Sequence, residues 1–177
     1  MLTRAFEIVA EMEGTARYPA SAMLREMAHS VGSRRLIGGQ VADLEAKARS
    51  TAADEIRFIH SRKTGEMISL ALRLGAMTAN ATPAQLRGLS EFGSALGLAY
   101  QVIDDILDIT QASDRLGKTA GKDAKSGKAT YPAVFGIEAA KKEAGRLTRK
   151  ALACAEQLGE RGFRLKQIAA RLLQRES

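Results

Sequence analysis

Three aspartates, Asp104, Asp105 and Asp108, interrupt an apolar stretch that the sequence predicts to be helical. On a helix, Asp104 and Asp108 lie one turn apart and share a face with Gln101. Asp105 points about 100° away from Asp104 round the helix axis. Like charges one turn apart destabilise a helix, and apolar neighbours make these charges costly to desolvate. We therefore expect a positive partner beside this face.

Oxygen ligands without nitrogen or sulfur favour a hard cation at this aspartate cluster. Magnesium commonly takes one or two protein carboxylates and completes its shell with water and substrate phosphate. No His or Cys in the neighbourhood favours zinc, and the glycine-centred calcium loop of an EF-hand is absent from the sequence. A solvated acidic face is the alternative interpretation, but the apolar residues on both sides weigh against it.

Residues 113–131, downstream of the aspartates, form a long irregular segment that is rich in Gly-Lys pairs. The pairs are Gly117-Lys118, Gly121-Lys122 and Gly127-Lys128. Glycine lets backbone amides approach an anion and lysine supplies charge, so the segment is typical of a phosphate-binding loop. Its spacing is not that of a Walker A loop, and a flexible basic loop without a ligand is the alternative. The neighbouring aspartates favour the phosphate-binding interpretation.

Two glycine-containing motifs lie inside other predicted helices. In Lys63-Thr64-Gly65, a threonine hydroxyl bonded to the preceding turn would bend the helix and direct Lys63 toward a cavity. The alternative is a surface lysine beside an incidental glycine. A glycine inside a helix costs about 1 kcal/mol relative to alanine, so Gly38-Gly39 indicates a tight helix crossing. Gln40 and Asp43 follow this pair, one turn apart.

Helices must position these motifs, because apolar residues recur at three- and four-residue spacing along nearly the whole chain. No stretch shows the sustained alternation of a strand, so we predict an all-α bundle in a single domain, residues 1–177. The clearest helix start is Thr82-Pro83, where Thr82 and Gln85 can form a capping box. The expected helices span residues 2–12, 20–31, 34–48, 53–79, 83–112, 132–158 and 164–175.

The net charge of +7 raises the question of nucleic-acid binding, but the positive residues are dispersed except within 115–128. No nucleic-acid motif accompanies them, which favours a local phosphate site. The one cysteine, Cys154, cannot form an internal disulfide, and we expect it in the core. We take His29 and His60 as packing or surface residues. No apolar run approaches the roughly 18 residues that span a bilayer, so we expect a cytoplasmic protein without stable membrane insertion.

Five motifs together resemble the trans-isoprenyl diphosphate synthases, the polyprenyl synthetases of the farnesyl and geranylgeranyl diphosphate type. They are GGQVADL at 38–44, KTG at 63–65, YQVIDDILD at 100–108, LGK at 116–118 and GKATYP at 127–132, in the order and approximate spacing of that family. The resemblance covers essentially the whole chain. It implies an isoprenoid-synthase-type helical bundle, usually a homodimer, with two aspartate-rich motifs that share magnesium ions across an apolar cavity.

The resemblance also implies a role for each matched residue. The second aspartate-rich motif, which holds Mg²⁺, would be Asp104, Asp105 and Asp108, with Asp104 the direct ligand and Asp108 acting through water. The contacts to the allylic diphosphate would be Lys63, Lys118 and Lys128. The groups that border the developing allylic cation would be Thr64 and Gln101. The cavity-lining residues would be Gln40, Asp43 and Tyr100, where phenylalanine is common.

The first aspartate-rich motif of that family has no counterpart in these 177 residues. The resemblance implies Mg²⁺-dependent condensation of an allylic diphosphate with isopentenyl diphosphate, but with half of the metal site absent. We therefore expect an N-terminally truncated bundle that binds diphosphate weakly and does not condense substrates alone. The alternatives are a noncatalytic subunit that pairs with a complete synthase, and a gene model that begins too late.

Overall fold

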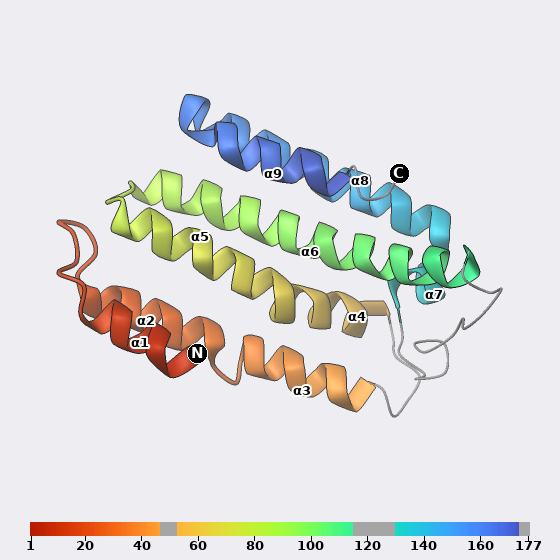
Figure 1. The fold of residues 1–177 in the computed structure, drawn as a ribbon, viewed down its shortest axis with the longest axis horizontal. Coiled ribbons are helices and arrows are strands. Elements are labelled where there is room, and N and C mark those ends of the chain that lie inside the picture. Colours follow the sequence, from red (N-terminus) through yellow and green to blue (C-terminus); the bar gives the residue numbers. More distant parts are fainter. Residues whose placement is uncertain (47–52, 115–129, 174–177) are drawn as a thin grey trace.

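The computed structural model describes residues 1–46, 53–114 and 130–173, and these residues form helices and turns without a strand (Figure 1). In chain order the elements are α1 (Leu2–Ala10), α2 (Ala20–Val31), α3 (Leu36–Ala46), α4 (Ala53–His60), the π-helical turn η1 (Ser61–Gly65), α5 (Glu66–Thr78), α6 (Pro83–Asp114), α7 (Tyr131–Phe135), α8 (Ile137–Glu156), the 3₁₀ turn η2 (Gly159–Gly162) and α9 (Phe163–Leu173). The all-α expectation is confirmed.

The helices run side by side in layers, with α6 at the centre (Figure 1). The continuous run of α4, η1 and α5 covers one side of α6, and α8 and α9 cover the other. The helices α1, α2 and α3 form the outermost layer beyond α4 and α5. None of the described helices is both long enough and apolar enough to cross a membrane.

Small residues let α6 and α8 pack closely. The core between them combines large side chains of α6 with alanines of α8. The large side chains are Phe92, Val102, Ile103 and Ile106, and the alanines are Ala140, Ala144, Ala151 and Ala155. Cys154 lies in the same core, as expected, and burial raises the pKa of its thiol. A second cluster joins α1, α2 and α5 through Val9, Met23, Met27, Val31, Leu70 and Met77.

Glycines bring η1 and α5 against the backbone of α6. A Cβ atom on Gly97 of α6 would overlap the Cα of Gly65, the last residue of η1. A Cβ atom on Gly93 would lie 2.7 Å from the Cα of Ser69 in α5. Neither position has room for a side chain, so the turn that carries Lys63 is in direct contact with the central helix.

Two of the expected helices differ from the structure. The helix expected over 132–158 is wrong as one element, because Gly136 has a φ of 84° and separates α7 from α8. The helix expected over 53–79 exists, but it contains the π-helical turn where the bend was expected. The capping box is confirmed: Thr82 N–H donates to Gln85 Oε1 at 2.8 Å and Gln85 N–H donates to Thr82 Oγ1 at 3.3 Å.

Candidate functional site

The aspartate cluster lies near the C-terminal end of α6, and its members have different surroundings. Asp104 is half-buried and Asp108 is exposed, whereas Asp105 is only 3% exposed. The Oδ2 atom of Asp105 accepts a hydrogen bond from the backbone N–H of Tyr131, with a distance of 2.7 Å. It also lies 3.4 Å from Nε2 of His60. Sequence reasoning assigned no contact to His60, because its partner lies far away in the chain.

The turn η1 presents Lys63 on the side of the bundle where α3 crosses it. Lys63 Nζ donates to Asp43 Oδ2 at 2.6 Å, so two predicted site residues form an ion pair. Lys63 is partly exposed and the Asp43 side chain is largely buried. A lysine at this place can exchange its carboxylate partner for an anionic ligand.

The tight crossing expected at Gly38-Gly39 is confirmed at Gly39. A Cβ atom there would lie 2.7 Å from Cβ of Arg62 and 3.0 Å from the backbone nitrogen of Lys63. The backbone of α3 therefore packs directly on η1. Helical spacing places Gly39 and Asp43 on the same face of α3, which explains how the carboxylate of Asp43 reaches Lys63.

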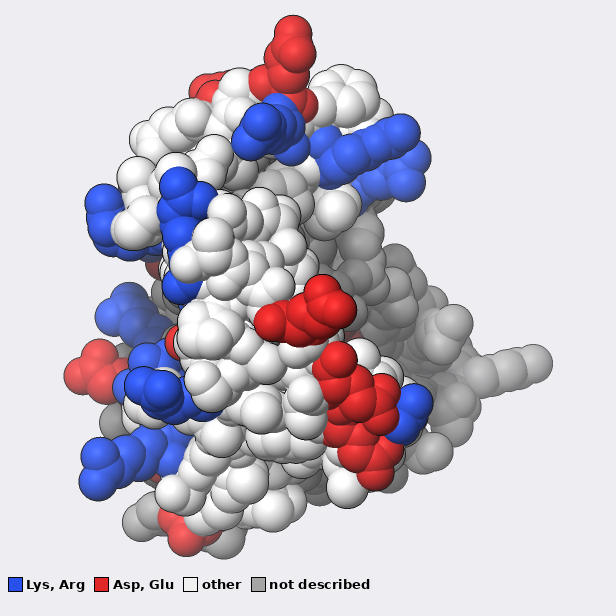
Figure 2. Space-filling view, turned by 90° about the vertical axis from the view of Figure 1, so that its left-hand side faces the viewer, with Lys and Arg blue, Asp and Glu red and all other residues white. Residues whose placement is uncertain are grey.

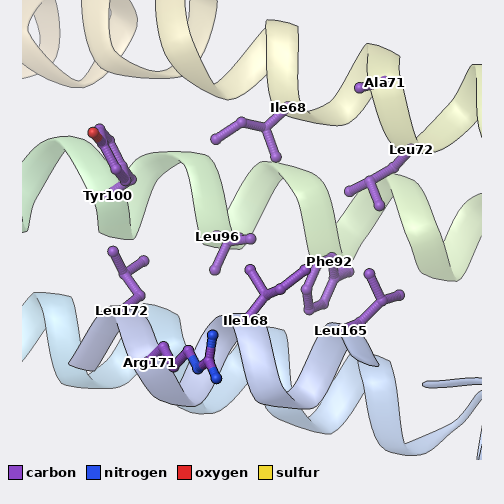
Figure 3. A pocket seen from close by; sticks show the side chains of 10 residues that line it. All are labelled: Ile68, Ala71, Leu72, Phe92, Leu96, Tyr100, Leu165, Ile168, Arg171 and Leu172. Atoms are coloured by element: carbon purple, nitrogen blue, oxygen red, sulfur yellow. The ribbon is translucent and has the colours of Figure 1, made fainter. Parts of the chain in front are cut away.

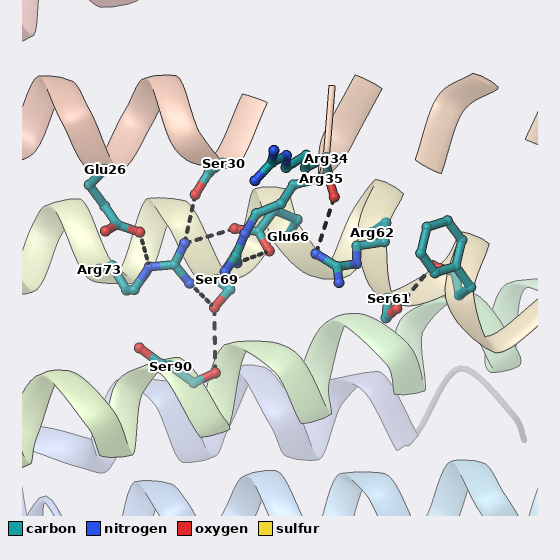
Figure 4. Close-up of polar contacts among 11 residues, drawn as sticks. Glu26, Ser30, Arg34, Arg35, Ser61, Arg62, Glu66, Ser69, Arg73 and Ser90 are labelled. Atoms are coloured by element: carbon teal, nitrogen blue, oxygen red, sulfur yellow. Dashed lines mark hydrogen bonds and ion pairs between the residues drawn. The ribbon is translucent and has the colours of Figure 1, made fainter. Parts of the chain in front are cut away.

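A buried charged network fixes α5 to α2 on the other side of η1 (Figure 4). Its centre is Arg73, whose guanidinium donates to Glu26 Oε1 at 2.7 Å and to Glu66 Oε1 at 2.8 Å. The same group donates to the hydroxyls of Ser69 and Ser30, each at 2.7 Å. No sequence pattern indicates this network, because its members are far apart in the chain and each is of a residue type that is usually solvated.

Glu66 has a second cationic partner, Arg35, which donates from Nη1 to Glu66 Oε2 at 2.8 Å. Burial opposes ionisation of Glu66, but hydrogen bonds from Ser30, Arg73 and Arg35 outweigh it and hold the pKa of Glu66 below its usual value. Glu66 directly follows η1, so the carboxylate ties the end of the turn to the start of α3.

An apolar cavity of about 550 Å³ lies between α5, α6 and α9 (Figure 3). It is lined by Ile68, Ala71, Leu72, Phe92, Leu96, Tyr100, Leu165, Ile168, Arg171 and Leu172. Tyr100 lies at one end of the cavity, and the side chains of Phe92 and Leu165 lie toward the other (Figure 3). Because Tyr100 directly precedes Gln101 and lies one turn before Asp104, the cavity begins beside the polar face of α6.

The remaining predicted site residues are Thr64, Gln101, Gln40, Lys118 and Lys128. Thr64 and Gln101 are half-buried, and Gln40 is exposed on α3. Lys118 and Lys128 lie outside the described residues, as does most of the segment expected to bind phosphate. The roles of these residues therefore stay predictions.

The carboxylates of α6 fit magnesium by their chemistry, since Asp104 and Asp108 supply oxygen ligands one turn apart. In the described part of the chain, no three His, Cys, Asp or Glu side chains gather closely enough to hold a metal ion. A magnesium ion at this face would therefore rely on phosphate and water for most of its shell, which is its usual behaviour in phosphate-transfer sites.

The end of the bundle that carries the α1–α2 and α5–α6 connections has no continuous basic stripe. On the described surface drawn in Figure 2, Lys and Arg side chains lie in separate groups around uncharged surface, and acidic side chains gather at one side. Binding along a nucleic-acid backbone requires a basic patch or stripe. On the described surface of this face, no continuous basic stripe connects the separate groups.

Comparison with known proteins agrees with the arrangement of these residues. The family model described as polyprenyl synthetase matches residues 1–162. Farnesyl diphosphate synthase from Geobacillus stearothermophilus is 38% identical over 146 residues, which cover 81% of this chain and 49% of that protein. The chain thus spans about half the length of this curated relative.

Solved structures show the same fold. A putative farnesyl-diphosphate synthase from Marinomonas sp. MED121 superposes with a TM-score of 0.81 at 30% identity, covering 97% of this chain and 58% of that one. Geranyltransferase from Helicobacter pylori, complexed with magnesium and isoprenyl diphosphate, superposes with a TM-score of 0.70 at 25% identity, covering 97% of this chain and 56% of that one. The family match and these similarities show that the chain belongs to the polyprenyl synthetase family.

Proposed function

We propose that these 177 residues form one wall of an isoprenyl diphosphate synthase site, where an allylic diphosphate is held for condensation with isopentenyl diphosphate. The observation that carries this proposal is the contact of η1 with α6. Gly65 lies directly on Gly97, and this contact brings the turn that carries Lys63 to the helix that carries Asp104 and Asp108. Carboxylates on one element and a partly exposed lysine on the adjoining element suit a metal-bound diphosphate.

In this proposal each residue has a task that follows from its position. Asp104 and Asp108 hold Mg²⁺, which when bound neutralises charge on the leaving diphosphate. Lys63 exchanges Asp43 for a phosphate oxygen, and Gln101 offers a polar group on the same face as the aspartates. The apolar cavity that begins at Tyr100 accommodates hydrocarbon and excludes water from a reactive carbocation. The complex of the Helicobacter pylori relative with magnesium and isoprenyl diphosphate supports this choice of ligand.

The first aspartate-rich motif of the resembled family has no counterpart in these 177 residues, so we expect them to bind diphosphate without turnover. A positioned electrostatic group is commonly worth on the order of 100- to 1,000-fold in rate, and here a whole set of carboxylates is lacking. The 177-residue chain should therefore bind diphosphate weakly in the presence of Mg²⁺ and show no appreciable condensation.

The outer face of α3 favours pairing with a second polypeptide. Ile37, Val41 and Leu44 recur at helical spacing, and each is about half exposed. Leu2 and Ile8 of α1, which belongs to the same outer layer, are also half exposed. A row of exposed apolar side chains is typical of an interface. We propose a homodimer through this face, and the second candidate function is a noncatalytic subunit that pairs with a complete synthase by the same face.

Calorimetric titration with inorganic diphosphate tests the proposed site. The wild-type chain should bind with Mg²⁺ and bind much more weakly without it, and Asp104→Ala should abolish the Mg²⁺-dependent part. Glu160→Ala is the matched control, because Glu160 is an exposed acidic residue in η2, an element that does not contribute to the proposed site. Binding that is unchanged in Asp104→Ala, or absent from the wild type, would exclude the proposed site.

A further inference from the structure

We infer that Asp105 is a positioning residue and not a metal ligand: it holds the Lys63 turn in place on α6, while its neighbour Asp104 serves the metal. This inference rests on the proposed function, because it assigns different tasks to adjacent carboxylates of the same site. It also differs from the role that the family resemblance implies, in which all three aspartates of the motif belong to the metal site.

The first argument is the environment of the carboxylate. Asp105 is buried, and its Oδ2 atom accepts the backbone N–H of Tyr131 at 2.7 Å. This hydrogen bond gives the buried carboxylate a partner within the chain itself. The side chain leaves α6 about 100° round the axis from Asp104. The buried carboxylate that accepts the Tyr131 amide therefore faces away from the more exposed side where a metal would bind.

The second argument is that three elements meet at this carboxylate. His60 ends α4 and its Nε2 atom lies 3.4 Å from Asp105 Oδ2, while Tyr131 begins α7. The rings of His60 and Tyr131 stack with centroids 6.5 Å apart, and Phe135 packs on Tyr131 at 4.4 Å. The carboxylate of Asp105 therefore joins α4 and α7 to the central helix.

The third argument connects this junction to the proposed site. His60 is the residue directly before η1, and Gly65 is the last residue of η1. The start of the turn is thus held on α6 by Asp105 through His60, and its end is held on α6 by the contact with Gly97. Lys63 lies between these fixed points. Its distance from the face of Asp104 consequently depends on Asp105, although Asp105 has no direct contact with the ligand in this scheme.

The test compares Asp104→Asn, Asp105→Asn and Asp105→Ala by titration with inorganic diphosphate, with and without Mg²⁺. The ratio of the affinities measured with and without Mg²⁺ reports metal binding separately from positioning. Asp104→Asn should bring this ratio close to one, because the variant no longer binds Mg²⁺ with the diphosphate. Asp105→Asn keeps an oxygen that can accept the Tyr131 amide, so the bond that positions α7 survives. Both affinities should therefore stay close to those of the wild type. Asp105→Ala should weaken both affinities by on the order of 10-fold, the lower end for lost supporting contacts, and leave the ratio unchanged.

Hydrogen exchange provides a measurement that does not depend on ligand binding. Asp105→Ala should accelerate amide exchange in peptides that cover residues 57–66 and 130–135, whereas Asp104→Ala should not. Loss of the Mg²⁺ ratio in Asp105→Asn, or unchanged exchange in Asp105→Ala, would overturn the positioning role. A wild-type chain that binds no diphosphate in the presence of Mg²⁺ would instead refute the proposed function, and the exchange result would still decide the structural role of Asp105.

Discussion

Replacing Arg73 with alanine should be among the most damaging single changes in the described bundle. The guanidinium donates four hydrogen bonds, to Glu26, Glu66, Ser30 and Ser69, and only 12% of the side chain is exposed. Removing one partner of a buried ion pair costs about 3–5 kcal/mol, because the other charge remains buried without compensation. Glu66 keeps Arg35 as a partner, so we place the loss at the lower end, about 3 kcal/mol.

Urea unfolding followed by circular dichroism measures this loss. With a slope of about 2 kcal/mol per molar urea, the midpoint of Arg73→Ala should fall by roughly 1.5 M. The control is Arg4→Ala, which removes an arginine from an exposed ion pair with Glu7 and should cost less than about 1 kcal/mol. A midpoint for Arg73→Ala close to that of Arg4→Ala would refute the view that the network stabilises the fold.

The pH dependence gives the same experiment a second readout. The pKa of Glu66 is held below its usual value of 4.5, so its ionised form stabilises the folded state above that pH. This contribution is lost as the pH falls through the folded-state pKa. Arg73→Ala removes one of the groups that depress the pKa, so the variant has less of this contribution to lose. The stability difference between wild type and variant should therefore narrow as the pH is lowered below 4.5.

Three further predictions concern the cavity, the helix contact and the ion pair of the site. Ala71→Trp should fill the cavity and weaken binding of a farnesyl diphosphate analogue but not of inorganic diphosphate, while Ala139→Trp on exposed α8 surface should change neither titration. Gly97→Ala should lower the free energy of unfolding by about 1–3 kcal/mol, because the added Cβ clashes with Gly65. Gly88→Ala is the control: its added Cβ meets no neighbour, so thermal unfolding should show a neutral or stabilising effect. Asp43→Asn should raise the affinity for inorganic diphosphate without Mg²⁺ by freeing Lys63, and Lys63→Met should lower it; the opposite order in calorimetry would contradict the proposed exchange of partners.

Sequence reasoning succeeded where the determining interactions are local. The Thr82–Gln85 capping box depends on residues that are three apart in the chain. The crossing at Gly39 could be predicted because glycine destabilises a helix relative to alanine and is therefore expected there only where another backbone packs closely. The break at Gly136 was missed because the apolar spacing continues through it from α7 into α8. Only the backbone angle at Gly136 shows that the helix ends there.

The charged network was missed for a different reason. Glu26, Glu66 and Arg73 are each ordinary residues for a helix surface, and they come together out of solvent, Glu26 only in part, because α2 packs against α5. Likewise, Asp104 and Asp105 are the same residue type at adjacent positions, and a difference of about 100° round the axis decides which is buried. Local pattern locates such a cluster, but tertiary packing determines what each member contacts.

The ion pair between Lys63 and Asp43 connects the packing of α3 to the expected magnesium dependence. In the proposed site, an incoming diphosphate would take Lys63 from Asp43, and this exchange would leave a largely buried carboxylate without the partner seen at 2.6 Å. Diphosphate alone also adds negative charge near Asp104 and Asp108, which opposes binding. A divalent cation bound with the diphosphate offsets the second cost, because it brings positive charge to the face of α6. If these residues form the proposed site, the carboxylates of α6 therefore favour a metal-bound diphosphate over the free anion.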